Sequence, residues 1–351
     1  MAQAKFILSK KVLKEQIKTL ENLKFKISYS YKTNKTVGRV IQSFKELDNI
    51  DFSIHAEQEI KDIKNKSRIW FFLQAQSKNK IEQLLKKGIK KYVIDNEIDL
   101  SNLLEVIKNK KSKIELLLRM KFEEHRIGTG KYFVYGLPSN KILEIIKKIS
   151  KNKYIEKLGI HIHRKSQNLT EWEILEEIKD SLPEEILEEI KMVNLGGGLP
   201  SRYISMNKEV FGYIFSKLKE VKDWLDKKGI ETIIEPGRFI SAPCIKLETR
   251  IIQIQDNNII INTSLYNCAL DNLLTGTKML VEQELKEEED GKFFLIKGNS
   301  PTRDDIFRYR VKLKKNIKIG DKITFLNAGA YNYATDFFGY KKLKTEIKED
   351  F

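Results

Sequence analysis

Between residues 26 and 238, short apolar runs alternate with longer stretches of helical periodicity. The runs are apolar on both faces, as expected of buried parallel strands. They predict eight strands, at 26–32, 52–55, 68–74, 91–95, 114–120, 158–163, 192–198 and 232–238. The intervening stretches repeat apolar residues every three or four positions, which predicts helices at 37–47, 57–63, 80–87, 100–107, 141–149, 172–190 and 210–228.

The eightfold strand–helix repeat is the pattern of a (β/α)8 barrel, which we assign to residues 25–240. An open, doubly wound sheet shares the alternation and remains the alternative. It seldom repeats so regularly, and the barrel is therefore the favoured interpretation.

The pattern changes after residue 242, where strands and turns replace the strand–helix repeat. Runs at 246–254, 258–262, 292–297, 308–313 and 322–326 predict an all-β domain over residues 241–351, with an exposed acidic loop at 283–291. Residues 1–24 are expected to contribute a strand at 6–8 and a linker helix at 10–23. The predicted fold class is α/β plus β, a TIM-like barrel followed by a C-terminal all-β domain.

The composition is that of a globular protein, with 41% hydrophobic residues in a chain of 351. No apolar run reaches the length of a bilayer span, and the first residues lack the apolar core of a signal peptide. Cys244 and Cys268 are too few for a disulfide framework or a cysteine zinc site. We therefore expect a cytoplasmic protein without a membrane partner.

The formal net charge of +16 raises the question of a nucleic-acid partner. The distribution of the charge argues against one, because the lysines lie mostly on polar helix faces or alternate with glutamate. No arginine-rich stripe with interleaved aromatic residues occurs. We interpret the charge as a solvated surface that favours anionic small ligands.

Ligand-binding residue types gather at the predicted carboxyl ends of the strands, where such barrels place their sites. The last strand runs into the sequence EPGR at 235–238, which offers an acid for a ring nitrogen and a guanidinium for a phosphate. Three glycines at 196–198 suit a phosphate, or form a plain flexible turn. Lys32 ends the first strand and suggests an imine with an aldehyde cofactor, because a buried ammonium is costly unless it is used.

His161 and His163 lie two positions apart on the sixth predicted strand, so their side chains point the same way. This spacing is compatible with a metal site, but no carboxylate or cysteine completes one, and we predict no metal. A flat imidazole stacked on a cofactor ring is the favoured interpretation for His163, with Ser166 donating to a phosphate.

Five motifs occur in an order that resembles the fold-type III pyridoxal-phosphate-dependent decarboxylases. They are SYKTN around Lys32, HIHRKSQ around His163, NLGGGLP, EPGRF and NAGAY. That family includes the ornithine, lysine, arginine and diaminopimelate decarboxylases, and the resemblance covers about residues 5–345. It implies an alanine racemase-like fold, pyridoxal phosphate as the cofactor, and a homodimer with shared active sites.

The resemblance also implies roles for individual residues. Lys32 would form the imine with the cofactor and Glu235 would pair with its pyridine nitrogen, which makes these two the predicted catalytic residues. Racemases of the same barrel carry an arginine in place of Glu235, so the acid favours decarboxylation. The other implied cofactor contacts are Arg119 beside the ring, His163 stacked on it, and Ser166, Gly196, Gly197, Gly198, Gly237, Arg238 and Tyr331 around the phosphate.

A loop near the C-terminus departs from the family pattern. Arg303 stands at the position of the family's cysteine, the expected proton donor, and arginine cannot serve as an ordinary acid at neutral pH. Asp304 is retained, and in the ornithine-type enzymes this acid meets the distal amine of the substrate. Ser53 and Lys165 stand where an Asp and a Gly are common, and Asp271 is a further candidate for a substrate amine.

Because Asp304 persists, the substrate we expect is a basic diamino acid of the ornithine or lysine type, decarboxylated by a homodimer that takes Asp304 from the partner subunit. Two alternatives stay open. One is a decarboxylase for a carboxylated or conjugated amino acid, such as diaminopimelate or a specialised-metabolite precursor, bound through Arg303. The other is a non-catalytic relative that keeps the fold and binds a partner, which the missing cysteine would allow.

Overall fold

Eight parallel strands close into a barrel in the computed structural model, which describes residues 2–122, 135–204, 206–207 and 209–351. In ring order the strands are β2 (Lys26–Ser30), β3 (Asp51–Ile54), β4 (Ile69–Leu73), β5 (Lys91–Ile94), β6 (Ile114–Lys121), β8 (Ile155–His161), β9 (Met192–Asn194) and β10 (Glu231–Ile234). The pairing of β10 with β2 closes the ring. The predicted barrel is therefore confirmed, and the open doubly wound sheet is excluded.

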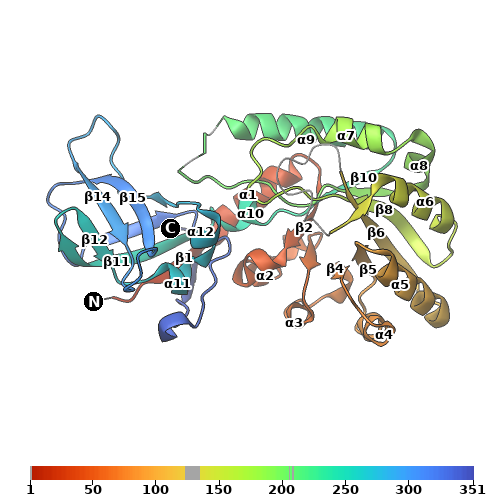
Figure 1. The fold of residues 1–351 in the computed structure, drawn as a ribbon, viewed down its shortest axis with the longest axis horizontal. Coiled ribbons are helices and arrows are strands. Elements are labelled where there is room, and N and C mark those ends of the chain that lie inside the picture. The colour runs from red at the N-terminus through yellow and green to blue at the C-terminus, as the bar shows by residue number, and fades with distance from the viewer. Residues whose placement is uncertain (1, 123–134, 205, 208) are drawn as a thin grey trace.

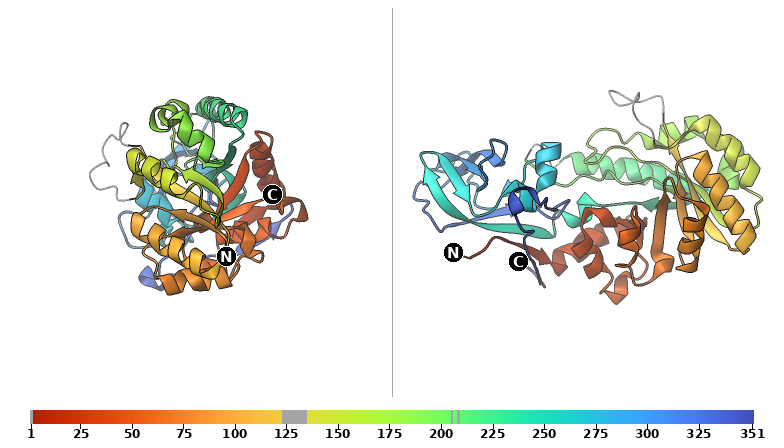
Figure 2. Two further views of the ribbon diagram at one scale, coloured as in Figure 1. Left: turned by 90° about the vertical axis from the view of Figure 1, so that its right-hand side faces the viewer. Right: turned by 60° about the horizontal axis from the view of Figure 1, so that its bottom comes forward.

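Helices cover the outside of the ring and connect successive strands (Figures 1 and 2). They are α2 (Lys35–Ile41), α3 (Glu57–Ile60), α4 (Lys78–Lys86), α5 (Glu97–Lys110), α6 (Ser139–Ile149), α7 (Ile174–Ser181), α8 (Glu184–Glu189), α9 (Val210–Lys227) and α10 (Arg238–Ser241). In α6, Ile142, Ile145, Ile146 and Ile149 are buried at the spacing of one helix face. Within the described ranges, no helix has the length and apolar character needed to cross a bilayer.

The prediction of one helix over 172–190 is wrong, because the segment forms two helices, α7 and α8. Leu182 between them is extended, with φ −125° and ψ 104°, and Pro183 precedes the first residue of α8. Proline lacks a backbone N–H and disfavours the helical conformation of the residue before it. The break at Pro183 therefore follows from local chemistry.

Four predicted strands end two to four residues earlier than expected, among them those predicted to end at 163 and 238, which end at His161 and Ile234. β2 ends at Ser30 and passes into the 3-10 turn η1 (Tyr31–Thr33), and β9 ends at Asn194. Gly196 has φ +69°, which takes the chain out of the extended conformation. The residues that follow these strands consequently lie in loops at the carboxyl end of the barrel.

A second, mostly antiparallel sheet forms the β domain that packs beside the barrel (Figure 1). Its strands run in the order β13 (Leu280–Val281), β16 (Lys322–Leu326), β11 (Ile245–Gln255), β12 (Asn258–Ile261), β14 (Lys292–Lys297) and β15 (Ile306–Leu313). β1 (Lys5–Ser9) pairs with β11 and with β17 (Thr345–Lys348), and α1 (Lys10–Glu21) leads from β1 into the barrel. The short helices α11 (Leu265–Cys268) and α12 (Leu270–Thr275) interrupt the domain, which is therefore not purely β.

Apolar side chains fill the interior of the barrel. Strand side chains alternate between the two faces of the sheet, and one set forms a buried cluster separate from the core under the helices. This inner cluster consists of Trp70, Val93, Leu117, Met192 and Ile233. The barrel is thus a packed core rather than a pore.

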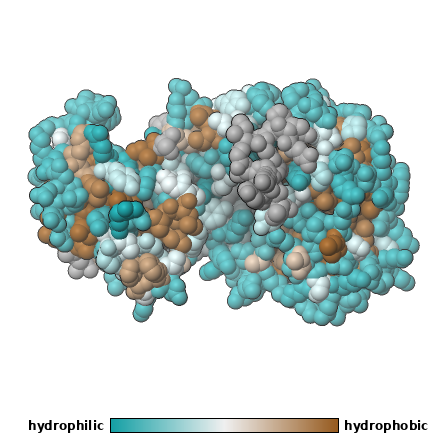
Figure 3. Space-filling view, in the orientation of Figure 1, coloured by the Kyte–Doolittle hydropathy of each residue, from teal (hydrophilic) through white to brown (hydrophobic). Residues whose placement is uncertain are grey.

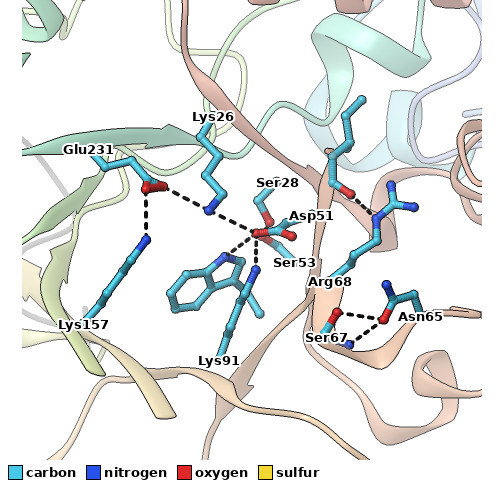
Figure 4. Close-up of polar contacts among 12 residues, drawn as sticks. Lys26, Ser28, Asp51, Ser53, Asn65, Ser67, Arg68, Lys91, Lys157 and Glu231 are labelled. Atoms are coloured by element: carbon cyan, nitrogen blue, oxygen red, sulfur yellow. Dashed lines mark hydrogen bonds and ion pairs between the residues drawn. The ribbon is translucent and has the colours of Figure 1, made fainter. Parts of the chain in front are cut away.

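Charged side chains close the amino end of the barrel, directly against this cluster (Figure 4). Asp51 Oδ2 accepts hydrogen bonds from Trp70 Nε1 at 3.1 Å and from Lys91 Nζ at 2.8 Å. Lys26 Nζ lies 3.9 Å from the same oxygen and 3.0 Å from Glu231. Asp51 is only 4% exposed, so the network compensates a charge that would otherwise be buried without a partner.

We expect Asp51→Ala to lower the free energy of unfolding by about 3–5 kcal/mol, because it leaves the Lys91 ammonium without its buried partner. Urea unfolding of the purified variant measures this loss. The control is Asp223→Ala, which breaks an exposed pair with Lys219 on α9 and should cost only about 0–1 kcal/mol. Similar losses of unfolding free energy in the two variants would contradict a stabilising role for the buried charge network around Asp51.

Candidate active site

A cavity of about 490 Å³ lies at the carboxyl end of the barrel. Its lining follows the strand ends and includes Lys32, His55, Gln74, Asp95, Arg119, His163, Ser166, Gly197, Gly198, Glu235, Gly237 and Arg238, together with Tyr331 from the β domain. The structure thus brings together most residues that the sequence motifs single out. Gly196, Asp271, Arg303 and Asp304 are not among the lining residues.

Glu235 lies one residue beyond β10 and is 6% exposed. Ser53 Oγ and Asn194 Nδ2 donate to its Oε1 atom at 2.8 and 2.9 Å. His161 Nε2 lies 3.2 Å from Oε2. Three strands, β3, β8 and β9, therefore provide the groups that surround this carboxylate.

These contacts keep Glu235 ionised at neutral pH. Burial raises the pKa of the carboxyl group, but His161, then His55 and the Ser53 hydroxyl, outweigh burial and lower the pKa to about 2. Burial lowers the pKa of His161 despite its acidic neighbour, so the imidazole is neutral. Its hydrogen then belongs on Nε2, facing Glu235, and Nδ1 is buried without a hydrogen-bond partner in the described part of the chain.

The His163 imidazole forms another wall of the cavity. Its Nδ1 atom accepts the backbone N–H of Gly197 at 3.2 Å, which fixes the orientation of the ring. Burial and then the charge of Arg119 lower the pKa of His163 to about 3, so this ring is also neutral. A fixed, uncharged aromatic surface suits stacking on a flat heterocycle.

The glycines at 197, 198 and 237 pack closely against neighbouring segments of the chain. Gly198 has φ +105°, a conformation that favours glycine. A Cβ on Gly197 would lie 2.9 Å from the Glu235 carbonyl oxygen, and one on Gly237 would lie 2.3 Å from Thr33 Oγ1. Neither glycine therefore tolerates a side chain without movement of its neighbours.

The N–H groups of this region divide into two sets. Those of Gly196 and Gly197 donate to Asn194 Oδ1 and His163 Nδ1. Those of Gly198 and Gly237 have no hydrogen-bond partner among the described residues. Only the second set is therefore available to an anion in the cavity, while Gly196 supports Glu235 by accepting its backbone N–H at 2.8 Å.

Arg238 is 4% exposed and is held on several sides. Its guanidinium donates to both carboxylate oxygens of Asp271, at 2.6 and 2.8 Å, and its Nε donates to Ser166 Oγ at 3.0 Å. The Tyr331 ring centre lies 4.7 Å from the guanidinium carbon. Burial lowers the pKa of Arg238, but the hydrogen bonds to Asp271 outweigh burial and raise it, so the group stays charged.

Lys32 lies in the turn η1, two residues beyond the end of β2, with its side chain exposed to the cavity. The described residues provide no hydrogen bond or ion pair to its ammonium group. Tyr331 donates its backbone N–H to the Thr33 carbonyl at 2.9 Å and so ties the β domain to this turn. The amine is therefore presented to the cavity by a turn that is itself anchored.

Arg303 and Asp304 lie in the loop between β14 and β15, outside the cavity of their own chain. Their side chains are 94% and 64% exposed and form an ion pair at 3.6 Å. The neighbouring Asp305 is fully buried and accepts hydrogen bonds from the Ser300 N–H and hydroxyl, which fixes the loop. The loop thus presents Arg303 and Asp304 to the surroundings of the molecule.

Reasoning from the sequence missed the groups that hold Glu235. Asn194 was not singled out, although it ends a strand directly before the glycine turn. Ser53 was noted only as a departure from the family pattern, and His161 only as a possible metal ligand. Within the residues that the structure describes, no group of three or more His, Cys, Asp or Glu side chains is gathered to hold a metal ion.

Residues 9–242 match the family described as pyridoxal-dependent decarboxylase, pyridoxal binding domain. The chain belongs to this family. The curated diaminopimelate decarboxylase of Halalkalibacterium halodurans is 30% identical over 192 residues, which cover 49% of this chain and 44% of the relative. Ornithine decarboxylase of Candida albicans is 27% identical over 198 residues, covering 44% of this chain and 41% of the relative. The matches therefore span less than half the length of either curated relative.

Solved structures of the family share the fold along the whole chain. Diaminopimelate decarboxylase from Helicobacter pylori, complexed with L-lysine, has a TM-score of 0.81 at 20% identity. The match covers 100% of this chain and 93% of that chain. This likeness confirms a barrel with an attached β domain, the predicted alanine racemase-like fold.

The cavity of this pyridoxal-dependent family member fits pyridoxal phosphate. Gly197, Gly198 and Gly237 line the cavity, and the N–H groups of Gly198 and Gly237 have no partner among the described residues. Lys32 and the ionised Glu235 line the same cavity. Together these groups supply an amine for an aldehyde, an acid for a ring nitrogen and donors for a phosphate.

The lowered pKa of Glu235 predicts a pH-dependent contribution to stability. The ionised carboxylate stabilises the fold above its ordinary pKa of 4.5, and this contribution is lost as pH falls from 4.5 toward 2. We expect Glu235→Gln to be less stable than the wild type by about 2–3 kcal/mol near pH 6, with the difference shrinking below pH 4.5. Urea unfolding of the cofactor-free proteins at a series of pH values measures it.

The control for this experiment is Glu220→Gln, which removes an exposed carboxylate on α9. Its unfolding free energy should run parallel to that of the wild type at every pH. A Glu235→Gln curve that is also parallel would contradict a stabilising, ionised Glu235.

Proposed function

We propose that this protein decarboxylates an L-amino acid with pyridoxal phosphate as the cofactor, and that the substrate is a basic diamino acid of the ornithine or lysine type. The observation that carries the proposal is the ionised Glu235 carboxylate in the same cavity as the Lys32 amine. When bound, pyridoxal phosphate supplies a ring that accepts the electron pair left behind as the carboxyl group departs.

The residues of the chain act on that ring through hydrogen bonds and charge. Glu235 Oε2 has one partner among the described residues, His161, which leaves an acceptor site for a ring N–H. An ionised acid in a buried position favours a protonated ring nitrogen. Glu235 therefore keeps the proton on the ring nitrogen, and the neutral His163 presents a face for the ring.

The remaining groups anchor the two ends of the cofactor. Lys32 provides the amine that binds the aldehyde carbon, and its turn is fixed by Tyr331. Gly198 and Gly237 offer backbone donors to the phosphate, and Ser166 offers a hydroxyl.

The choice of a basic diamino acid rests on Asp304. Both curated relatives act, by their names, on diamino acids, and the Helicobacter pylori enzyme holds L-lysine. Asp304 is exposed and does not line the cavity of its own chain, as an acid supplied to a partner subunit would be. We propose that the protein acts as a homodimer in the cytoplasm and that Asp304 meets the distal amine across the interface.

The surface of the β domain supports a partner subunit. Figure 3 shows hydrophobic residues gathered over this domain and along its border with the barrel, whereas the barrel face in that view is largely hydrophilic. Tyr309, Phe337 and Phe338 of the domain are each about half exposed or more, at 60%, 50% and 49%. Apolar surface of this kind marks sites of protein association.

One observation favours a second candidate substrate, an amino acid with a distal carboxylate. Basic residues outnumber acidic ones in the cavity lining, which contains Lys32, Arg119, Arg164, Lys165 and Arg238 against Asp95 and Glu235. Two of these cations are paired with acids outside the lining, Arg164 with Glu177 and Lys165 with Glu171. Glu235 is committed to the cofactor ring in the proposed function. A cationic lining favours an anionic distal group, as in a carboxylated or diaminopimelate-like substrate.

The decisive experiment incubates the holoenzyme with carboxyl-labelled amino acids and traps the released CO2. We expect release from ornithine or lysine, and none from Lys32→Ala, which should also lack the yellow, borohydride-sensitive absorption of the wild type. Lys108→Ala, an exposed lysine on α5, is the matched control and should retain both. Release from diaminopimelate alone would replace the proposed substrate with the second candidate, and a protein that takes up no cofactor would refute both.

A shared active site predicts complementation between inactive subunits. Lys32→Ala and Asp304→Ala proteins should each be nearly inactive, and freely exchanging subunits should recover about a quarter of wild-type activity, because half the dimers contain one intact site. The control mixture of Lys32→Ala with Glu235→Ala should recover nothing, since both residues line the cavity of one chain. If the mixture of Lys32→Ala with Asp304→Ala is no more active than either protein alone, Asp304 does not act across the interface.

A further inference from the structure

We propose that Asp271 is a positioning residue for the phosphate end of the cofactor site, acting through Arg238 and Ser166, and not a group that binds a substrate amine. This inference deepens the proposed function and rests on its cofactor. It assigns a role to a carboxylate that lies outside the cavity.

The pairing of Asp271 with Arg238 uses most of the guanidinium. Both side chains are buried, at 8% and 4% exposure, and two hydrogen bonds of 2.6 and 2.8 Å join them in a fork. Paired forks of this kind are short, strong and directional. Arg238 consequently has its orientation fixed by Asp271 before any ligand arrives.

The donor count limits what Arg238 can offer to a phosphate. A guanidinium carries five N–H donors. Two donate to Asp271, one donates to Ser166 Oγ at 3.0 Å, and one lies 3.4 Å from the hydroxyl of Tyr203. One N–H is left, so Arg238 cannot form a second fork with phosphate oxygens while it holds Asp271.

Ser166 links the fixed orientation of Arg238 to the cavity. Its Oγ atom accepts the Arg238 Nε hydrogen, so the hydroxyl hydrogen is left to donate to another group. Ser166 lines the cavity together with Arg238, and the carbonyl of the preceding Lys165 packs against Gly198. Asp271 thus fixes Arg238, and Arg238 directs the Ser166 hydroxyl toward an anion beside the glycine turn.

The same geometry argues against contact between Asp271 and a substrate amine. Arg238 lines the cavity and Asp271 does not, so the guanidinium lies on the cavity side of the carboxylate. An incoming ammonium would have to displace a buried, bidentate partner. Removing one member of such a pair is strongly unfavourable, because the other charge stays buried.

The ion pair between Asp271 and Arg238 also joins the two domains. Asp271 belongs to α12 of the β domain, and Arg238 begins α10 at the end of the barrel. Tyr331, also from the β domain, packs on the guanidinium with its ring centre 4.7 Å away. The β domain therefore sets the shape of the phosphate end of the barrel site.

The test measures the binding of pyridoxal phosphate, and separately of pyridoxal, to the cofactor-free full chain in the absence of any amino acid. We expect Asp271→Asn to weaken binding of pyridoxal phosphate by about 10–100-fold, the usual effect of losing a residue that orients a ligand-binding group. Binding of pyridoxal, which has no phosphate, should stay close to wild type. Because no amino acid is present, the result does not depend on which substrate is decarboxylated.

The matched control is Glu284→Gln, which breaks the partly buried pair between Glu284 and Arg308 in the β domain, outside the cavity. This variant should bind both ligands as the wild type does. Equal weakening in the control and in Asp271→Asn would show a general effect on the β domain and overturn the proposal.

A second variant tests Ser166, the last residue in the series Asp271, Arg238 and Ser166. It remains informative if Asp271→Asn does not fold. Ser166→Ala should also weaken binding of pyridoxal phosphate selectively, and the double variant should lose less than the product of the two effects. Unchanged binding in Ser166→Ala would overturn the proposal. So would an Asp271→Asn protein with normal cofactor affinity and a raised KM for the amino acid, the result expected of a substrate-binding acid.

Discussion

The site depends on keeping one buried carboxylate charged. Glu235 is buried at the end of β10, and a lone ion there would take up a proton. The barrel avoids this because neighbouring strands place Asn194 and His161 in register with Ile233, so that their polar atoms converge on the carboxylate. Ring closure between β10 and β2 brings Ser53 of β3 within reach from the other side. The electrostatics of the site are therefore a property of the closed ring.

The β domain contributes more to the site than its distance along the chain suggests. Tyr331 fixes the turn that carries Lys32, and its ring packs on the Arg238 guanidinium. Asp271 in α12 accepts hydrogen bonds from the same guanidinium. Gly237, between Glu235 and Arg238, packs so tightly on Thr33 that the two ends of the barrel ring are held together. In the proposed function, the barrel would supply the ring-binding half of the cavity, and contacts between the domains would shape the phosphate-binding half.

The periodicity of the sequence was sufficient for the barrel because its strands are apolar on both faces and its helices on one. The motifs around Lys32, His163 and Glu235 located the cavity, since parallel strands in a ring deliver their ends to one place. The single helix predicted over 172–190 was wrong because Pro183 breaks the helix, although the apolar periodicity continues across it. The partners of Glu235 could not be predicted, because Ser53 lies 182 residues away in the chain and meets it only through ring closure. The Asp271–Arg238 fork was hidden for the same reason, since it spans two domains.

The charged network at the amino end of the barrel determines from which side a ligand can reach the cavity. Asp51 and its lysines lie against Trp70 and the apolar cluster, so the described interior is filled from that end up to the cavity. The cavity is therefore reached only from the carboxyl end among the described residues. In the proposed function, the amino acid would enter, and the carbon dioxide and amine would leave, on the side where the strand ends meet the β domain. Any group that covers that side would then control entry and exit together, and the amine product would have to leave before the next substrate could reach Lys32.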